Sequence, residues 1–455
     1  MIVRFTVSNF LSFKEPVEFN MLTGSPRRLD HHAYEPAEGV ELLKMAAIYG
    51  ANGAGKSNLV KAMLFLRDLV TKGWLSPTTF QFRLAADSAD QPTSFEVEFL
   101  CEGRMYLYGV DLASNYILEE WLYQTQQGKS DKIIFHRYTK DGKTLIETTP
   151  LFTKTDEQRL MVRLYEQDLL KPTEALLRVW GESKSDFGPV KEIFSWLAKS
   201  WTILFPHSTT NGIVWGLLTN QKFFDFAKEM MCSFHTGIVD LEVVTLGLKE
   251  FFGENSNNLR EVESKFSQAE AAGENLIIKN NDLREEVLIV REDGQIRVKR
   301  LLLMHEGPKG QLTPFTIFQE SDGTRRLLEL VPAFFRAIFE PVPVIIDEIE
   351  QAIHPVMLRE LVSKFSQNKQ TKGQLIFTTH EAHLLDQEYL RQDEFWFVEK
   401  SPEGATSLTP LSDFKDVRYD LDLRKGYLLG RFGAIPFTGD LRQLNWDTYA
   451  ETEQQ

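Results

Sequence analysis

The chain of 455 residues contains only two cysteines, Cys101 and Cys232. Two cysteines so far apart supply neither a disulfide framework nor a metal cluster, so we expect a reducing compartment. No apolar run approaches the length that spans a bilayer. The first residues alternate in polarity as a strand does and lack the features of a signal peptide. These absences favour a cytoplasmic protein without a membrane partner.

Positive charge is also scarce. Lysine and arginine number 51 against 65 aspartates and glutamates, which gives a net charge of −14. This balance argues against a protein that coats nucleic acid through bulk charge, but it leaves a local basic groove open. The clearest basic cluster is Arg297, Lys299 and Arg300. It could contact nucleic acid or an acidic partner, although a solvated strand face is the favoured interpretation.

The most informative motif is GANGAGKS at residues 50–57, which has the spacing of a phosphate-binding P-loop. A strand-like apolar run precedes it and a helix-like stretch follows it. In such a loop, glycines let backbone N–H groups curl around phosphate oxygens at a helix N-terminus. Lys56 would then reach the β- and γ-phosphates, and the Ser57 hydroxyl would bind Mg²⁺. The motif predicts a nucleotide site.

Two acids follow a short β-branched run at residues 342–346. This pattern is typical of a buried parallel strand that delivers side chains at its carboxyl end. Asp347 would hold Mg²⁺ through water, and Glu348 would polarise the attacking water as catalytic base. The alternative is a strand that simply ends at an acidic turn.

Two further motifs fit a γ-phosphate. Ser321-Asp322-Gly323-Thr324 begins an apolar-periodic helix and would bind the γ-phosphate held by another subunit, or Ser321 would only cap the helix. His380 ends a second β run and would sense the γ-phosphate, although a lone histidine there is usually structural. Glu350 and His354-Pro355, between these strands, would shape a subunit contact or simply start a helix.

This order of motifs resembles ABC-type ATPases. The opening at Asn9-Phe10-Leu11-Ser12-Phe13 resembles the SMC, RecF and OLD branch, where such a strand precedes the P-loop. The likeness is narrower still to the AAA-15/AAA-21 group of bacterial ATPases. The features that carry it are the Ser-Asp-Gly-Thr-Arg motif, the segments 349–355 and 395–399, and the tail 426–436. Members of this group include ATPase components of phage-defence pairs of the AbiL/RloA type and the AriA subunit of PARIS.

The resemblance implies an α/β fold, an ABC-type P-loop ATPase head of two lobes that dimerises with ATP and Mg²⁺ between subunits. It assigns nucleotide binding to these residues: Gly50, Asn52, Gly53, Gly55, Lys56, Ser57, Asn58, Ser321 and Gly323. It assigns catalysis to Lys56, Ser321, Glu348 and His380, and Mg²⁺ to Ser57 and Asp347. The signature departs from the glycine-rich transporter type, and no Q-loop glutamine can be placed. Gln81 and Gln91 are candidates, each more readily explained as a surface residue.

We expect four segments along the chain. Residues 1–125 form an N-terminal ATPase lobe, and residues 126–284, which are largely helical in pattern, form an insertion. We expect this insertion to be compact and not a long coiled coil, because prolines interrupt it and no sustained heptad is present. Residues 285–400 form the C-terminal lobe, in which residues 292–295 make a hairpin turn. Residues 401–455 form a tail, which is too short for the metal-binding nuclease domain that OLD proteins carry there.

The leading functional hypothesis is an ATPase that senses infection and controls a separate toxic effector, a nuclease for example, in anti-phage defence. It would act as a homo-oligomer, at least an ATP-sandwich dimer, with a phage protein or DNA as trigger. The alternative is a RecF-like, ATP-dependent DNA-binding repair protein. A self-contained nuclease is a third hypothesis, and a transporter ATPase is the least favoured. Fold-level likeness supports the chemistry better than the biological role.

Overall fold

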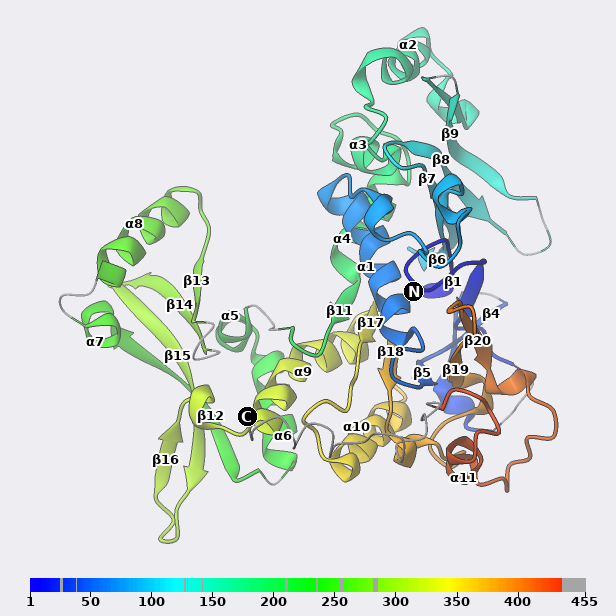
Figure 1. The fold of residues 1–455 in the computed structure, drawn as a ribbon. Coiled ribbons are helices and arrows are strands. Elements are labelled where there is room, and N and C mark those ends of the chain that lie inside the picture. Colours follow the sequence, from blue (N-terminus) through cyan, green and yellow to red (C-terminus); the bar gives the residue numbers. More distant parts are fainter. Residues whose placement is uncertain are drawn as a thin grey trace, which may run out of the picture. The chain divides into compact units, whose positions relative to one another are not determined.

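The computed structural model describes residues 1–24, 28–37, 39–126, 128, 130–140, 142–208, 212–234, 236–253, 257–280 and 285–435. Contacts divide the chain into two compact units. The N-terminal unit consists of Ile2–Ser195 and Thr378–Gln455, and the central unit consists of Met1 and Trp196–Phe377. The helix α4 (Val190–Ser200) and the strand β18 (Gln374–Thr379) contain the points where the chain passes between units. Figure 1 traces the elements in chain order.

An antiparallel sheet of the N-terminal unit has the most strands of the sheets that the structure describes. Its strands, in spatial order, are β10 (Lys143–Thr148), β9 (Lys132–Lys140), β8 (Ile117–Thr125), β7 (Arg104–Leu112), β6 (Thr93–Cys101), β1 (Ile2–Ser8) and β2 (Val17–Asn20). In β6, buried Phe95, Val97 and Phe99 alternate with partly exposed Ser94, Glu96 and Glu98. Such a two-residue period is expected of a strand with one face on a core. A separate pair, β3 (Ala33–Ala37) and β4 (Val40–Leu43), precedes the P-loop.

The P-loop lies between β5 (Met45–Gly50) and α1 (Lys56–Lys72), as the sequence predicts. Every residue of β5 is buried, and β5 pairs in parallel with β19 (Phe395–Lys400), which pairs antiparallel with β20 (Thr406–Pro410). Leu59, Met63 and Leu66 give α1 an apolar face at helical spacing. This helix ends at Lys72 and is followed by its C-cap residue Gly73, whose φ of 101° favours glycine.

Residues after 400, which the sequence predicted to be a tail, belong to the N-terminal unit and form regular elements packed on it. Besides β20, they form α11 (Leu423–Leu428). Phe432 stacks on Phe397 of β19 with ring centroids 5.0 Å apart, and Tyr427 lies 5.8 Å from Tyr49 of β5. The resembling tail segment 426–436 therefore packs on the P-loop strand and its neighbour, except that Pro436 lies outside the described residues.

The other helices divide between the units. In the N-terminal unit they are α2 (Asp156–Leu164), which continues as a π-helix at Tyr165–Leu169, and α3 (Leu176–Glu182). In the central unit they are α5 (Ile213–Thr219), α6 (Gln221–Ser233), α7 (Leu248–Phe252), α8 (Asn257–Ala271), α9 (Asp322–Phe339) and α10 (Pro355–Gln367). No helix within the described ranges is long and apolar enough to cross a membrane.

Parallel strands of the central unit carry the acidic motif. β17 (Pro343–Ile346) lies between β11 (Thr202–Leu204) and β18, and both pairings are parallel. Leu204 and Phe377 are the partners of Ile346 in these pairings. All four residues of β17 are buried, which explains why the segment reads as a continuous apolar run.

A second sheet of the central unit is antiparallel. Its strands run in the order β12 (Ile238–Gly247), β15 (Gln295–Glu306), β14 (Glu285–Glu292) and β13 (Leu276–Asn280), and β16 (Leu312–Phe315) also pairs with β15. The predicted hairpin at residues 292–295 is confirmed: Asp293 and Gly294 join β14 to β15 with φ of 50° and 76°. Two consecutive positive φ values are what a two-residue type I′ turn requires.

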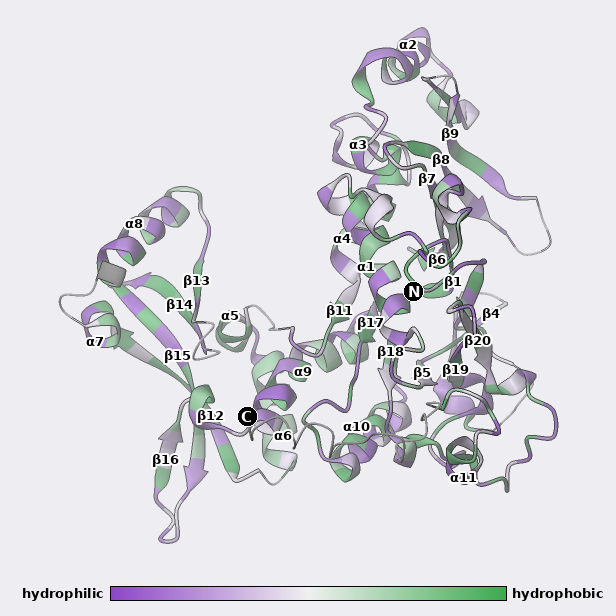
Figure 2. Cartoon of the chain, in the orientation of Figure 1, coloured by the Kyte–Doolittle hydropathy of each residue, from purple (hydrophilic) through white to green (hydrophobic). Residues whose placement is uncertain are grey.

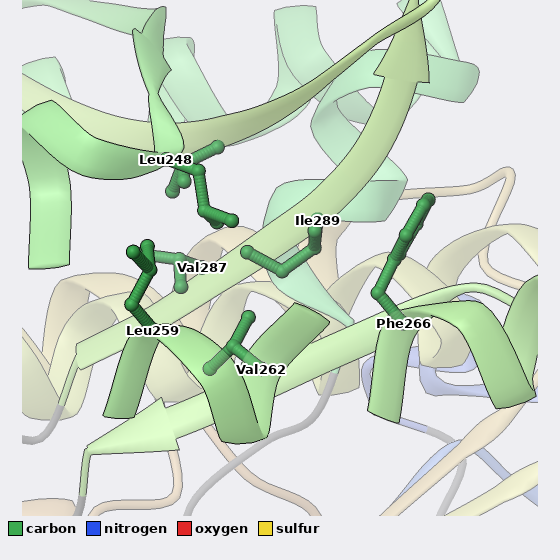
Figure 3. Close-up of a cluster of buried hydrophobic side chains, with 7 residues drawn as sticks. Leu248, Leu259, Val262, Phe266, Val287 and Ile289 are labelled. Atoms are coloured by element: carbon green, nitrogen blue, oxygen red, sulfur yellow. The ribbon is translucent and has the colours of Figure 1, made fainter. Parts of the chain in front are cut away.

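One face of this sheet is covered by α7 and α8 around a small apolar core. In Figure 3, Leu259, Val262 and Phe266 of α8 point toward Val287 and Ile289 of β14. Their spacing of three and four residues puts them on one side of the helix, and the alternation with polar residues can be followed in Figure 2. The sheet and α8 therefore stabilise each other through this cluster.

We expect Phe266→Ala to destabilise the central unit by about 3 kcal/mol, because it removes a buried ring and leaves a cavity. Phe318→Ala is the matched control, since Phe318 is 51% exposed and its loss should change stability by no more than about 0.5 kcal/mol. Urea unfolding followed by hydrogen exchange of the β14 amides measures both. Equal effects of the two substitutions would contradict the role of the cluster.

The compact units do not follow the expected segment boundaries. The chain divides at residues 195/196 and 377/378, inside the expected insertion and inside the expected C-terminal lobe. The segment 126–284 contains α2 to α8, but also β9 to β13. Strands of this segment join sheets whose other members come from before residue 126 or after 284, a long-range pairing that local sequence patterns do not encode.

Candidate functional site: a P-loop and an acidic strand

The P-loop backbone needs its glycines. A Cβ on Gly50 would lie 2.7 Å from the Val398 carbonyl oxygen of β19, closer than real Cβ contacts. Gly53 and Gly55 have φ of 78° and 120°, conformations that side-chain-bearing residues rarely adopt. The loop can therefore turn its amides inward ahead of α1, as a phosphate site requires.

Lys56 is folded into this loop. Its side chain is 4% exposed, and Nζ donates to the carbonyl oxygens of Gly50 at 2.8 Å and Ala51 at 3.2 Å. Nζ also lies 3.1 Å from Nε2 and 3.3 Å from Nδ1 of His380. The structure thus brings together two residues, 324 positions apart, that the sequence assigned to the γ-phosphate.

The remaining P-loop residues take different positions. Asn52 is exposed and Ser57 is partly buried. The Asn58 side chain, at the third position of α1, donates to Ser12 Oγ at 2.7 Å. This bond connects the loop to the Asn-Phe-Leu-Ser-Phe opening of the chain.

That opening forms a clamp. Asn9, 3% exposed and with φ of 47°, donates from Nδ2 to the carbonyl oxygens of Ser88 and Gln91 at 2.8 and 2.9 Å. Its Oδ1 accepts from the amide of Phe82. Phe10 packs against Phe65 of α1 with centroids 5.3 Å apart. The motif therefore holds the segment 82–91 and the P-loop helix against β1.

The acids leave β17 as predicted. Asp347 is 2% exposed, and its amide donates to the Leu204 carbonyl oxygen at 2.8 Å. Glu348 follows with φ of 50°, a left-handed conformation that is costly for a residue with a side chain. Such outliers are concentrated at active sites, where the surrounding structure enforces them.

A loop that sequence reasoning missed lies at the same sheet edge. Because β11 and β17 are parallel and in register, Phe205, Pro206 and His207 leave the sheet beside the acids. The sequence did not reveal this loop because β11, with three residues, gives too weak a pattern to be recognised.

The Q-loop candidates Gln81 and Gln91 belong to the N-terminal unit. Gln91 is exposed, but Gln81 is only 8% exposed, so its interpretation as a surface residue is wrong: it packs in the loop that Asn9 clamps.

The signature motif caps α9. Ser321 Oγ accepts from the Thr324 amide at 3.1 Å, which confirms the N-cap that the sequence allowed. A Cβ on Gly323 would lie 2.7 Å from the Ala352 carbonyl oxygen, so this glycine lets the helix start approach the segment after the acids. The cap and a γ-phosphate role are compatible, because the hydroxyl and the other first-turn amides are separate groups.

Arg326, one turn into α9, was not identified from the sequence. It is 3% exposed, and Nη1 lies 3.4 Å from both Glu329 Oε2 and the Phe205 carbonyl oxygen. Burial lowers the pKa of this guanidinium, and the carboxylates of Glu329, Asp347 and Glu348 oppose the change. Arg326 thus links α9 electrostatically to the acidic strand and to the loop after β11.

Two other polar residues cap helices of the structure. His354 caps α10, with Nδ1 accepting from the Val356 amide at 3.3 Å, so the helix-start interpretation of His354-Pro355 is confirmed, and a subunit contact stays a prediction. Asp422 caps α11 by accepting from the Lys425 amide. In the part of the chain that the structure describes, no group of three or more histidines, cysteines or acids could hold a metal ion.

The basic cluster is largely neutralised. Lys299 Nζ lies 2.6 Å from a carboxylate oxygen of Glu292, and Arg300 forms a two-point ion pair with Glu285. Both acids come from β14, the neighbouring strand. These pairs favour the interpretation of a paired, partly solvated strand over that of a phosphate-binding surface.

A mixed α/β chain with a glycine cradle after a buried strand, a lysine inside it and paired acids ending a parallel strand has the features of a P-loop ATPase. A protein-family model, described as "AAA domain, putative AbiEii toxin, Type IV TA system", matches residues 45–153 and 245–386, more than half of the chain. The chain therefore belongs to this AAA family. The matched ranges include the P-loop, the signature, the acids and His380.

Solved structures are also similar. One is described as the crystal structure of the SmcHead bound to the C-winged helix domain of ScpA, with 12% identity, a TM-score of 0.37, and coverage of 90% of this chain and 96% of that one. Another is the SMC head domain from Thermotoga maritima, with 11% identity, a TM-score of 0.33, and coverage of 90% and 98%. No curated protein matches the chain.

Proposed function

We propose that this protein is a cytoplasmic ATPase that binds ATP between two copies of the chain, hydrolyses it, and uses the cycle to control a separate toxic effector in anti-phage defence. The observation that carries the proposal is the P-loop, in which a buried lysine lies within hydrogen-bond distance of His380 and of the loop carbonyls. A γ-phosphate would take the place of these partners as acceptor for the Lys56 ammonium.

The roles at the site follow from the chemistry of each side chain. The loop amides and Lys56 bind the phosphates, His380 contacts the γ-phosphate, and Glu348 takes the proton of the attacking water. The Gly50, Gly53 and Gly55 positions leave the cradle free of side chains. Charge that develops on the γ-phosphate is met by donors already in place, the largest source of catalysis in such sites.

The residues present also suit Mg²⁺. Ser57 provides a hydroxyl and Asp347 a carboxylate, the oxygen donors that Mg²⁺ prefers, and Mg²⁺ typically keeps several waters rather than requiring an all-protein cage. A bound Mg²⁺ would neutralise phosphate charge and orient the γ-phosphate. Asp347 would hold the ion through water, and Ser57 would bind it directly.

Two copies are proposed because of the signature. Ser321 begins an 18-residue helix, α9, whose first-turn amides and dipole favour an anion. In the proposed dimer, Ser321 and Gly323 of one copy complete the site that holds the P-loop of the other. Each site would then need residues from both chains.

This arrangement predicts complementation in mixtures. Lys56→Ala and Ser321→Arg should each be inactive alone. An equimolar mixture should recover about a quarter of wild-type ATPase activity, because half of the dimers are mixed and each has one intact site. Phosphate release measures the outcome. Activity of the mixture no higher than that of the single variants would contradict the shared site.

Control of an effector is supported by the family that this chain belongs to, whose description mentions a toxin and a toxin–antitoxin system. The direct test is to tag the protein, express it with its neighbouring genes, and identify what copurifies with and without ATP. We expect a stoichiometric toxin, a nuclease for example, that is held or released according to nucleotide. A phage protein or DNA would be the trigger.

A RecF-like repair role is the competing function. The ion pairs of Lys299 and Arg300 weigh against it, since these cations already have carboxylate partners. A lone ATPase whose turnover is stimulated by duplex DNA, with no copurifying protein, would overturn the defence proposal and favour repair.

A further inference from the structure

The P-loop is supported from behind by a residue that no motif includes. Thr406 begins β20, roughly 350 positions after the loop, and is 4% exposed. Its Oγ1 lies 2.7 Å from the Ala54 carbonyl oxygen and 2.7 Å from Ser12 Oγ. Its amide donates to the Ser12 carbonyl oxygen at 2.7 Å.

Counting donors gives this network one direction. A threonine hydroxyl has a single hydrogen, and a carbonyl oxygen can only accept, so Thr406 donates to Ala54. Ser12 must then donate its hydroxyl hydrogen to Thr406 Oγ1. The Asn58 side-chain amide donates to Ser12 Oγ, so the chain of bonds runs from Asn58 through Ser12 and Thr406 to Ala54. Every hydroxyl in it is used as both donor and acceptor.

The last bond fixes the orientation of the peptide between Ala54 and Gly55. In a trans peptide, the carbonyl of one residue and the N–H of the next point in opposite directions, and no cis peptide occurs in the described chain. Holding the Ala54 carbonyl toward Thr406 therefore turns the Gly55 N–H away from Thr406. The packing of Thr406 and Ser12 also leaves no room for a side chain at residue 55, since a Cβ on Gly55 would lie 2.8 Å from Thr406 Cγ2 and 2.9 Å from Ser12 Oγ.

We propose that Thr406, with Ser12, is a positioning residue of the nucleotide site: its hydroxyl fixes the Ala54–Gly55 peptide so that the Gly55 amide is ready to donate to a phosphate. This rests on nucleotide binding at the P-loop, as proposed above. The peptide next to a glycine with φ of 120° is free to rotate unless something holds it, and Thr406 supplies that restraint.

The test compares variants that differ by one hydroxyl. Thr406→Val keeps the shape and removes the donor, whereas Thr406→Ser keeps the donor. Calorimetric titration with ATPγS should give a Kd about tenfold higher for Thr406→Val, as expected for the loss of one buried hydrogen bond. Thr406→Ser should stay within about twofold of wild type, and KM for ATP should rise more than kcat falls. Thr144→Val, a buried threonine of β10, is the control for the same substitution elsewhere and should bind like wild type.

A double-mutant cycle with Ser12→Ala adds an independent readout. Because both hydroxyls act through one chain of bonds, the double variant should bind only slightly more weakly than either single variant. If Thr406→Val does not fold, Ser12→Ala carries the same expectation for Kd. Wild-type affinity in Thr406→Val, or equal loss in Thr406→Ser, would overturn the positioning role while leaving the nucleotide site intact. Absence of ATPγS binding by the wild type would overturn the nucleotide site itself.

Discussion

Lys56→Ala is expected to raise the Kd for ATP at least about 100-fold, since charge-assisted hydrogen bonds to phosphate contribute roughly 1.5–3 kcal/mol each and Lys56 would make two. The buried ammonium already lies in the loop with its carbonyl partners, so its removal deletes the cation at the centre of the cradle. Calorimetric titration measures the loss directly.

Lys61→Ala is the matched control, because Lys61 lies on the same helix α1 with an exposed side chain. It should bind ATP like wild type. Lys56→Met, which keeps most of the side-chain volume, separates loss of charge from loss of packing: we expect it to bind as poorly as Lys56→Ala while melting closer to wild type. ATP binding by Lys56→Met at wild-type affinity would show that the phosphates lie elsewhere.

Glu348→Gln is expected to lower kcat about 10²–10³-fold while leaving the Kd for ATP nearly unchanged, because it removes the proton acceptor without changing the shape of the site. Glutamine has the same backbone preferences, so the φ of 50° at this position should cost the variant no more than the native chain. With hydrolysis stalled, ATP should hold two copies together, which light scattering coupled to size exclusion detects.

Glu360→Gln, on α10 of the same unit, tests for general effects of losing a carboxylate, since Glu360 is exposed. Its turnover should match wild type. The assignment of Glu348 fails if Glu348→Gln hydrolyses ATP at the wild-type rate. If turnover falls without an ATP-dependent dimer, the catalytic role stands and the two-copy arrangement fails.

Short motifs were readable because their physical causes are local. Glycines at fixed spacing, a β-branched run ending in acids, and Asp293-Gly294 at a hairpin turn each follow from the conformations those residues allow. The same reasoning placed His380 at the end of β18 and Ser321 at the start of α9. It could not choose between a cap and a phosphate contact for Ser321, because both use the same helix start.

Long-range placement was beyond the sequence. Thr406 lay in a segment that was expected to be a tail, and nothing near it in the chain indicates a contact with Ala54 or Ser12. The short strand β11 and the buried cation of Arg326 were missed for the same reason. The sequence favoured a solvated strand face for the basic cluster, but it could not show that the neighbouring strand β14 provides carboxylate partners for Lys299 and Arg300.

The sequence by itself therefore determined the class of chemistry, because the backbone of a P-loop and the side chains that meet a phosphate are specified within a few residues of each other. Only the tertiary structure decided which distant residues support that loop. Hydrogen bonds such as those of Asn9 to Ser88 or of Thr406 to Ala54 join positions tens to hundreds of residues apart. Such pairs depend on how strands meet in a sheet and on which polar groups burial forces to find partners.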